Sequence, residues 1–279
     1  MPSPAPVGLL LDVDGPIASP IERRIVIDSI VSDLLTLASA GIPIAFVTGR
    51  SDAFMREQVV ARLVGAGPDR GGLDARAHVF GVFEKGGCWA PVTPQGLGEL
   101  EVDTLVAVPD TLRTAVESLA RERYADTMFV DEGKQVMISL EQRTDVASEV
   151  FLEARGRCVA EIAGLMASLE VGPGFRIDPT IISIDVESVR LDKDLGAARA
   201  LDWFRARGVS AERWWSVGDS RSDYLMADAV HARGIPVAHV DVRPGDGMLE
   251  RAYDVVVESD LIHDAAGAAF LRRRVAELG

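Results

Sequence analysis

An apolar run leads into two aspartates near the start of the chain: Val7-Gly8-Leu9-Leu10-Leu11-Asp12-Val13-Asp14-Gly15. Such a run, ended by turn residues, is typical of a strand buried on both faces of a parallel sheet. Asp12 and Asp14 therefore emerge where the strand ends, which is where open α/β sheets bind ligands. Two neighbouring carboxylates can bind a divalent cation, and one can act as nucleophile while the other transfers protons. The same residues also fit an acidic turn, so further signals are needed.

Length and composition are those of a folded globular protein. The chain has 279 residues, of which 48% are hydrophobic and 26% charged, and this length fits one large domain or two ordinary ones. The formal net charge is −14, which disfavours a nucleic-acid partner because phosphate neutralisation needs clustered Lys and Arg. A small phosphorylated ligand is still compatible, since it responds to the local field of its site.

The cysteines and the apolar segments bear on the cellular compartment. Cys88 and Cys158 are the only cysteines, too few and too far apart for a disulfide framework or a zinc ribbon. Cys158 lies on the apolar face of a predicted helix, so a buried free thiol is expected there. No apolar stretch approaches the roughly 18 residues that cross a bilayer, and the first residues lack the basic region of a signal peptide. We therefore expect a cytoplasmic protein with no membrane partner.

Strand-like and helix-like patterns alternate at both ends of the chain, which predicts an α/β fold with a parallel sheet. After the Asp12 strand, the first part predicts a helix, a strand, a helix and a strand, over 25–40, 44–47, 51–63 and 78–83. The last part predicts helices over 191–207 and 222–231, strands over 213–217, 235–240 and 254–257, and a C-terminal helix.

The pattern changes after Glu84. Residues 93–101 look like a loop, and two helices, over 109–124 and 144–170, are then each followed by two strands, over 128–130 with 136–140 and over 175–177 with 181–186. This order predicts a small antiparallel sheet covered by helices. We therefore expect a Rossmann-like core formed by residues 1–84 and 188–279, with an inserted α+β domain over 85–187.

Three further polar signals follow the predicted strands or open the predicted helices. Thr48-Gly49 ends the second strand, and Lys193 begins the helix after the insertion. The strand predicted over 213–217 ends in Gly218-Asp219-Ser220-Arg221-Ser222-Asp223, which opens the next helix. Taken singly, these residues fit an ordinary turn, a solvated lysine, and helix-capping carboxylates.

Together and in this order, the four segments resemble the motifs of the haloacid dehalogenase (HAD) superfamily. The matching residues are Asp12-Val13-Asp14-Gly15, Thr48, Lys193 and the segment from Gly218 to Asp223. The resemblance covers nearly the whole chain and implies that the insertion is a C2-type cap of the C2B form. Glu84-Lys85-Gly86-Gly87 also looks like a variant of a Glu-Asn-Gly-Ala stretch common in that branch.

The resemblance implies phosphatase chemistry. Asp12 would attack the phosphorus of a phosphomonoester and form an aspartyl-phosphate, while Asp14 would protonate the leaving oxygen and then activate water. Because a phosphomonoester repels nucleophiles through its own charge, the site must also supply cations and donors. The implied substrate is a small phosphorylated metabolite, such as a sugar phosphate or a phosphoglycolate-like compound.

The resemblance also implies the cofactor and its ligands. Mg²⁺ would be held by the side chains of Asp12 and Asp219 and the backbone carbonyl of Asp14, with Asp223 close by, and these hard oxygen ligands suit that ion. The residues implied to bind the phosphoryl group are Thr48, Gly49 and Lys193. Lys193 would also offset repulsion among the carboxylates.

Some features leave alternatives open. Pro16 stands where many members carry Thr and removes a backbone donor from the first motif. Arg50, directly after Thr48-Gly49, is a candidate substrate contact or a surface residue. The histidines show no ligand spacing and no histidine metal site is expected: His78, His231, His239 and His263. A phosphomutase of the phosphomannomutase type and a catalytically weak binding protein are the alternative functions, and the sequence predicts no oligomeric state.

Overall fold

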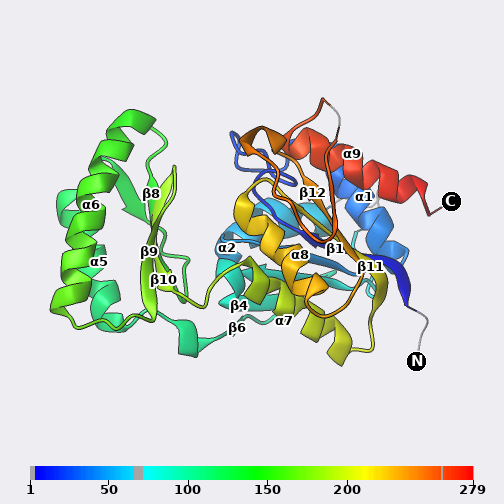
Figure 1. The fold of residues 1–279 in the computed structure, drawn as a ribbon, viewed down its shortest axis with the longest axis horizontal. Helices are drawn as coiled ribbons and strands as arrows, with labels where there is room; N and C mark the ends of the chain where they lie inside the picture. The colour runs from blue at the N-terminus through cyan, green and yellow to red at the C-terminus, as the bar shows by residue number, and fades with distance from the viewer. Residues whose placement is uncertain (1–3, 66–71, 259, 279) are drawn as a thin grey trace. The chain divides into compact units, whose positions relative to one another are not determined.

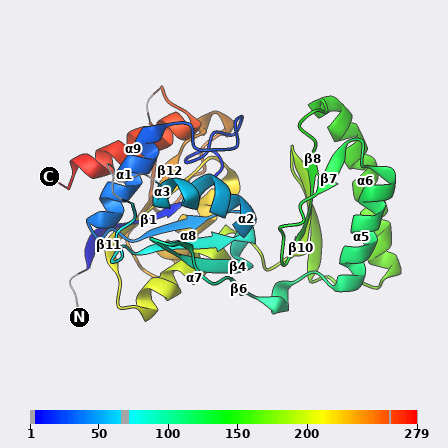
Figure 2. The ribbon, with the colours of Figure 1, turned by 180° about the vertical axis from the view of Figure 1, so that it is seen from behind.

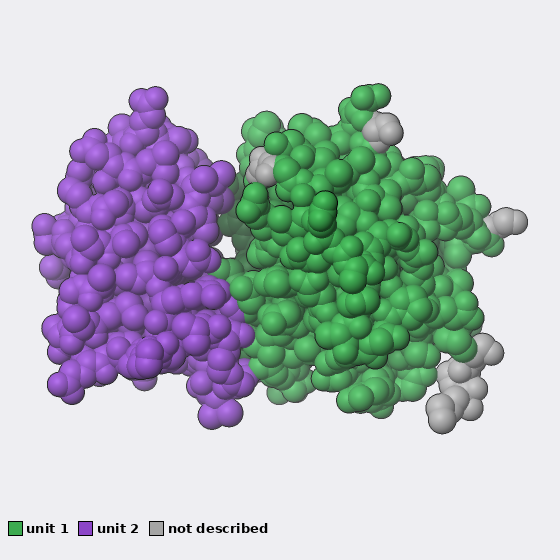
Figure 3. Space-filling view, in the orientation of Figure 1, with its two compact units in different colours: residues 1–101, 192–279 green, residues 102–191 purple. Residues whose placement is uncertain are grey.

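The computed structural model describes residues 4–65, 72–258 and 260–278. The chain divides into two compact units, and Figure 3 shows which residues belong to each. Unit 1 comprises Met1–Glu101 and Asp192–Gly279, and unit 2 comprises Val102–Leu191. Each unit has a sheet and a hydrophobic core of its own.

Unit 1 is built on a mostly parallel sheet in the order β13-β12-β11-β1-β2-β3-β4-β5. Its strands are β1 (Ala5–Leu11), β2 (Ile44–Val47), β3 (Val79–Phe83), β4 (Cys88–Thr93), β5 (Gly96–Leu97), β11 (Ala211–Gly218), β12 (Val237–Asp241) and β13 (Asp254–Val256). The short β6 (Glu101–Val102) pairs with β4. β1 is central and runs parallel to β11 and β2, with Leu9 opposite Trp215 on one side and Ile44 on the other.

Helices cover the sheet of unit 1 on both faces (Figures 1 and 2). α7 (Lys193–Ala206) and α8 (Tyr224–His231) pack together and share a core with Leu10, Phe80 and Trp214 of the strands. On the other face α1 (Asp28–Ser39) lies beside α9 (His263–Ala276).

The helix predicted over 51–63 consists of α2 (Asp52–Met55), a π-helix (Arg56–Val60) and α3 (Ala61–Val64). Short 3₁₀ helices span Glu84–Gly86, Thr104–Val106, Arg221–Asp223 and Pro244–Asp246.

Residues 88–97 differ from the sequence prediction. They were expected in the insertion, but β4 runs antiparallel to β3 and β5 pairs with β4, so both strands extend the sheet of unit 1. The expected loop over 93–101 likewise contains β5 and part of β6. The physical reason is a sharp turn over Glu84–Gly86, where Glu84 and Lys85 have φ values of 50° and 54° and return the chain along β3. The domain boundaries at 85 and 187 stay predictions.

Unit 2 has an antiparallel sheet in the order β7-β8-β10-β9. Its elements are α5 (Asp110–Arg123), β7 (Met128–Val130), β8 (Ile138–Gln142), α6 (Ser148–Ser168), β9 (Phe175–Pro179) and β10 (Ser183–Ser188). Ile138, Leu140, Ile184 and Val186 share a core with the apolar sides of both helices, whereas the alternating positions are polar. The expected α/β fold, a Rossmann-like core with an inserted α+β unit, is therefore confirmed.

Both cysteines are buried free thiols in the structure. Within the described residues, no helix has the length and apolar character that crossing a membrane requires.

Candidate active site

The carboxyl ends of three adjacent parallel strands meet at one edge of the sheet of unit 1. β1 lies between β11 and β2, and the residues that directly follow these strands are Asp12, Asp219 and Thr48. The backbone N–H of Asp12 donates to the Val217 carbonyl at 2.9 Å, and that of Thr48 donates to the Val82 carbonyl at 3.0 Å. The hydrogen bonds between the parallel strands therefore fix where each side chain leaves the sheet. They also bring together three segments that are distant in sequence.

Lys193, the first residue of α7, reaches this edge with its ammonium group. Its Nζ donates to Asp12 Oδ1 at 2.5 Å and to the Val47 carbonyl at 2.8 Å, and it lies 2.8 Å from Asp223 Oδ1. Lys193 and Asp12 are each only 6% exposed, and Asp223 is fully buried. One buried cation therefore bridges two buried carboxylates.

Asp223 also organises the loop that follows β11. Its Oδ2 accepts from the backbone N–H of Asp219 at 3.1 Å, and from the backbone N–H and the hydroxyl of Ser220 at 2.9 and 2.7 Å. One carboxylate oxygen therefore shapes the loop while the other faces Lys193. The loop in turn holds the partly exposed carboxylate of Asp219 at the strand end.

Two basic residues that the sequence reasoning missed lie beside Asp219. Arg243 Nη1 is 3.9 Å and His263 Nδ1 is 3.5 Å from Asp219 Oδ2. Arg243 lies just beyond the end of β12 in the same parallel sheet, and this position after a strand could have identified it as a candidate site residue. His263 begins α9 with a φ of 51° and is far from every motif, so no sequence pattern selected it.

Burial and charge set the ionisation of the cluster. Burial raises the pKa of Asp12 well above its usual value, the nearby Asp223 carboxylate adds to the rise, and Lys193 offsets only part of it. Burial alone would lower the pKa of Lys193, but the carboxylates of Asp12 and Asp223 outweigh it and raise the pKa. Burial, with repulsion from Asp223, also raises the pKa of Asp219 to about 6. Ionisation of Asp12 and Asp219 is therefore disfavoured in the absence of further positive charge.

The acidic residues fit a divalent cation. Asp12, Asp219 and Asp223 each offer a carboxylate oxygen, and these oxygens all lie within 4.8 Å of one another. Hard oxygen donors are what Mg²⁺ prefers. Burial, together with the nearby Asp223 carboxylate, raises the pKa values of Asp12 and Asp219, so a bound cation would stabilise their ionised forms. The side chain of Asp14 is not part of this group, and a role for its backbone carbonyl as a metal ligand stays a prediction.

The loop after Asp14 is tightly folded. Gly15 has a φ of 95°, and a Cβ atom there would lie 2.7 Å from Asp219 Cγ, so the position requires glycine. The N–H of Ala18 donates back to the Val13 carbonyl at 2.8 Å. Pro16 turns its carbonyl towards Gly267 of α9, so closely that any Cβ at Gly267 would overlap it. The influence of Pro16 on turnover stays a prediction.

Thr48, Gly49 and Arg50 form the turn after β2. The hydroxyl of Thr48, which is fully buried, accepts a hydrogen bond from the backbone N–H of Arg50 at 3.1 Å. Gly49 lies next to the side chain of Lys85, with 3.7 Å between Lys85 Cε and an ideal Cβ at Gly49. Arg50 turns its guanidinium to Asp14, at 2.9 Å from Nε to Oδ2. Arg50 thus joins the cluster through Asp14, and its contact with a substrate stays a prediction.

The sequence and the structure were compared with those of known proteins. No protein-family model and no curated protein matches the sequence. Among solved structures, the C-terminal domain of a C. albicans trehalose-6-phosphate phosphatase is 15% identical, with a TM-score of 0.67 over 97% of this chain and 92% of that one. A Thermoplasma acidophilum protein is 13% identical, with a TM-score of 0.59 over 98% and 100%. A Plasmodium falciparum IMP-nucleotidase is 10% identical, with a TM-score of 0.53 over 99% and 62%.

These neighbours all belong to the haloacid dehalogenase superfamily. The chain has the HAD fold. The resemblance inferred from the four motifs is therefore confirmed at the level of the fold. The segments that resemble the four motifs follow β1, β2 and β11 and open α7, and in the structure they form one cluster.

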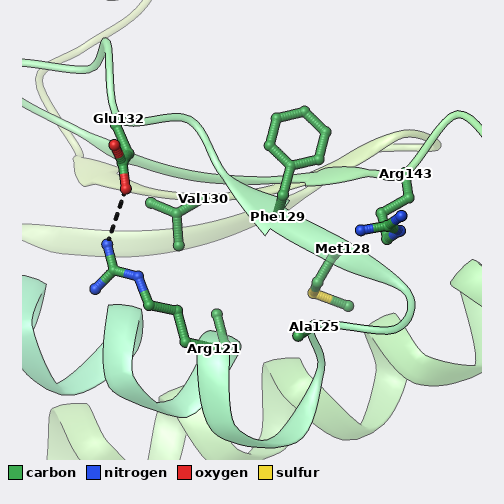
Figure 4. Close-up of a pocket in the computed structure, with 8 residues that line it drawn as sticks. Arg121, Ala125, Met128, Phe129, Val130, Glu132 and Arg143 are labelled. Carbon is green, nitrogen blue, oxygen red and sulfur yellow. Dashed lines mark hydrogen bonds and ion pairs between the residues drawn. The ribbon is translucent and has the colours of Figure 1, made fainter.

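Two pockets among the described residues lie away from the cluster around Asp12. Figure 4 shows one of about 230 Å³ in unit 2, between the end of α5 and β7. Its charged groups are paired: Arg121 binds Glu132 at 3.3 Å, and Arg143 binds Asp145 at 3.0 Å. A larger pocket of about 700 Å³ in unit 1 has an apolar lining that includes Phe204 and Trp214. Its charged groups are also paired, since Asp202 binds Arg205 at 3.1 Å and Arg233 at 3.2 Å. We therefore assign the candidate active site to the cluster around Asp12.

Unit 2 also contains an acidic group, made of Asp178, Asp185 and Glu187. Arg176 binds Glu187 at 2.8 Å, and the hydroxyl of Ser139 donates to Asp185 at 2.5 Å. Glu187 and Asp185 thus have partners within their own sheet, so this group is a weaker candidate metal site than the cluster around Asp12.

Proposed function

We propose that this protein is a Mg²⁺-dependent phosphatase that hydrolyses a small phosphorylated metabolite through an aspartyl-phosphate. The observation that carries the proposal is the cluster in which Lys193 bridges Asp12 and Asp223 while Asp219 lies alongside. The similarity in fold to a trehalose-6-phosphate phosphatase and an IMP-nucleotidase supports it.

The reaction would take two steps. Lys193 holds Oδ1 of Asp12, so Oδ2 is the oxygen that attacks phosphorus, while the bond from phosphorus to the ester oxygen breaks and Asp14 gives its proton to that oxygen. Water then attacks the aspartyl-phosphate and passes a proton to Asp14. Phosphate leaves, and Asp12 and Asp14 return to their starting states.

Other proposed roles are to bind the metal ion and the phosphoryl group. Asp12 and Asp219 would hold Mg²⁺ together with the Asp14 carbonyl, and Asp223 would support them from its buried position. The ion would neutralise charge on the phosphoryl oxygens. Lys193, the Thr48 hydroxyl and the Gly49 backbone would bind the same phosphoryl group.

The substrate class follows from the neighbours and the chemistry. Trehalose 6-phosphate and IMP, for which two neighbours are named, are both small phosphomonoesters, and we propose a sugar phosphate or a phosphoglycolate-like compound here. Unit 2 would act as a C2-type cap of the C2B form and contribute to substrate choice. A cytoplasmic location is part of the proposal, because a reducing compartment keeps Cys88 and Cys158 as free thiols.

The test is release of phosphate from a panel of phosphorylated metabolites, with and without Mg²⁺. We expect Mg²⁺-dependent turnover, and we expect Asp12→Asn to lower it by at least about 1,000-fold because the nucleophile is lost. Mass spectrometry of acid-quenched enzyme should detect a phosphorylated Asp12 peptide in the wild type.

Asp254→Asn is the matched control, because Asp254 is an exposed aspartate of unit 1 that pairs with Arg213 outside the site. It should leave turnover unchanged. Release that persists in Asp12→Asn would refute the mechanism. Transfer of phosphate to a second sugar hydroxyl would identify a phosphomutase, and no reaction with any compound would favour a binding protein.

A further inference from the structure

Arg50 holds both oxygens of the Asp14 carboxylate. Its Nε lies 2.9 Å from Oδ2 and its Nη2 lies 3.0 Å from Oδ1. Two parallel bonds of this kind fix the plane of a carboxylate as well as its position. The Arg50 side chain is 12% exposed and that of Asp14 is 33% exposed, so the pair is formed in a partly buried place where its bonds are less screened by solvent than at an open surface.

The guanidinium is itself held in place. The backbone N–H of Arg50 donates to Thr48 Oγ1 at 3.1 Å, and the backbone N–H of Glu84 donates to the Arg50 carbonyl at 3.1 Å. The guanidinium carbon also lies 4.8 Å from the centre of the Phe54 ring, within the range of a cation–π contact. Both ends of the residue are therefore anchored to β2, to the turn after β3 and to α2.

Asp14 needs such a support more than Asp12 does. Asp12 is nearly fully buried against Lys193, but Asp14 is more exposed and precedes the tight turn at Gly15. A side chain that transfers a proton must lie within hydrogen-bond reach of the reacting oxygen. A small rotation of an unsupported carboxyl would move it out of reach.

We propose that Arg50 is a positioning residue that orients the Asp14 carboxyl for proton transfer. This proposal rests on the phosphatase function proposed above. As the bond between phosphorus and the leaving oxygen breaks, one Asp14 oxygen gives its proton to the leaving oxygen while the other still accepts from Arg50. Arg50 acts only through Asp14 in this scheme. A lysine cannot replace it, because a single ammonium cannot bind both oxygens in one plane.

The test compares substrates whose leaving groups differ in their need for a proton. An alkyl phosphate such as glycerol phosphate expels a strongly basic oxygen, whereas p-nitrophenyl phosphate expels a stable phenolate. We expect Arg50→Ala to lower kcat/KM for the alkyl phosphate by about 100-fold, the lower end of general-acid effects. The loss for p-nitrophenyl phosphate should be less than about 3-fold by the same reasoning, because its leaving oxygen needs no acid.

Three variants complete the design. Arg50→Lys should show the same contrast between the two substrates, and added guanidinium ion should restore alkyl-phosphate turnover in Arg50→Ala. Asp14→Asn should show the contrast at least as strongly. Arg56→Ala removes an arginine that pairs with Asp52 at 2.9 Å in the same helical segment, and it should change neither substrate. Because the contrast is a ratio within one variant, it does not depend on how much of that variant folds.

The possible outcomes distinguish a failure of the Arg50 proposal from a failure of the proposed phosphatase function. An equal loss for both substrates would overturn the inference, because it would mean that Arg50 binds the phosphoryl group or only maintains the fold. An unchanged Arg50→Ala would overturn it as well. If the wild type hydrolyses neither substrate nor any metabolite of the panel, the phosphatase function fails and the inference fails with it.

Discussion

His239 is a buried histidine outside the candidate site. Its Nδ1 lies 2.7 Å from Ser216 Oγ, its ring centre lies 4.0 Å from that of Tyr224, and its Nε2 is buried with no hydrogen-bond partner among the described residues. Burial lowers the pKa of His239 to about 4, although nearby carboxylates, Asp223 first among them, oppose the shift. The folded protein therefore keeps this imidazole neutral where the unfolded chain would protonate it.

The pH dependence of stability follows from this difference. Between pH 6.5, the ordinary pKa of histidine, and about pH 4 the unfolded chain binds a proton at His239 that the folded protein does not. As the pH is lowered from 6.5 to about 4, the contribution of His239 should therefore reduce the free energy of unfolding by about 3 kcal/mol. Urea unfolding at several pH values measures it. His239→Asn should lose less stability than the wild type over the same range, and equal losses would contradict the assignment.

At the scale of elements, α9 packs against the first motif. Gly267 faces the carbonyl of Pro16, and a Cβ atom at this position would overlap that oxygen. We expect Gly267→Ala to push the loop of residues 15–18 out of place. The expected loss is about 1–3 kcal/mol of unfolding free energy, typical of overpacking, together with lower phosphatase turnover. Thermal unfolding and the activity assay measure the two effects.

Gly156 of α6 is the matched control for Gly267. It is exposed in the middle of a helix, and a Cβ atom there would have no neighbour within 4 Å. Gly156→Ala should therefore stabilise unit 2 by roughly 0.5–1 kcal/mol, because alanine has the higher helix propensity. If both variants changed stability in the same direction, the close contact at Pro16 would not be the cause.

Most elements could be predicted because their hydrophobic periodicity survives in the fold. α6 and α7 lie within the predicted helices over 144–170 and 191–207, and the central strands lie at or near their expected positions. β4 was missed although Cys88, Ala90 and Val92 alternate inward, because Pro91 argues against a strand. Turn chemistry at Glu84 and Lys85, which take left-handed φ values that usually favour glycine, was not readable from the sequence either.

Some features of the candidate site could likewise be predicted from the sequence and others could not. Strand ends predict which residues gather at the edge of a parallel sheet, so Asp12, Thr48 and Asp219 could be named in advance. Contacts between side chains could not be predicted. Nothing in the sequence pairs Arg50 with Asp14 or brings His263 to Asp219, because these contacts depend on side-chain conformations and on the packing of α9.

At the scale of the whole molecule, the two units have separate hydrophobic cores. All four tryptophans, Trp89, Trp203, Trp214 and Trp215, belong to unit 1. Tryptophan fluorescence should therefore follow the unfolding of unit 1, whereas far-UV circular dichroism follows both units. We expect the two signals to have different midpoints in urea, a departure from two-state unfolding.

Mg²⁺ should shift only one of these transitions. The proposed ligands all lie in unit 1, and an ion at 100 times its dissociation constant stabilises the state that binds it by about 2.7 kcal/mol. The tryptophan midpoint should rise with Mg²⁺ while the second transition stays in place. Asp219→Asn should abolish the shift, and a shift of both transitions together would contradict the assignment.

The pairing of β1 with β11 has a consequence for protein synthesis. β1 precedes unit 2 in the chain, whereas its neighbour β11 and the cation Lys193 leave the ribosome only after the whole of unit 2. Unit 2 is one continuous segment, so its core can close as soon as it emerges. The nascent chain must therefore carry one unpaired apolar edge of β1 until β11 emerges, and Asp12 meets Lys193 and Asp219 only after unit 2 has been made.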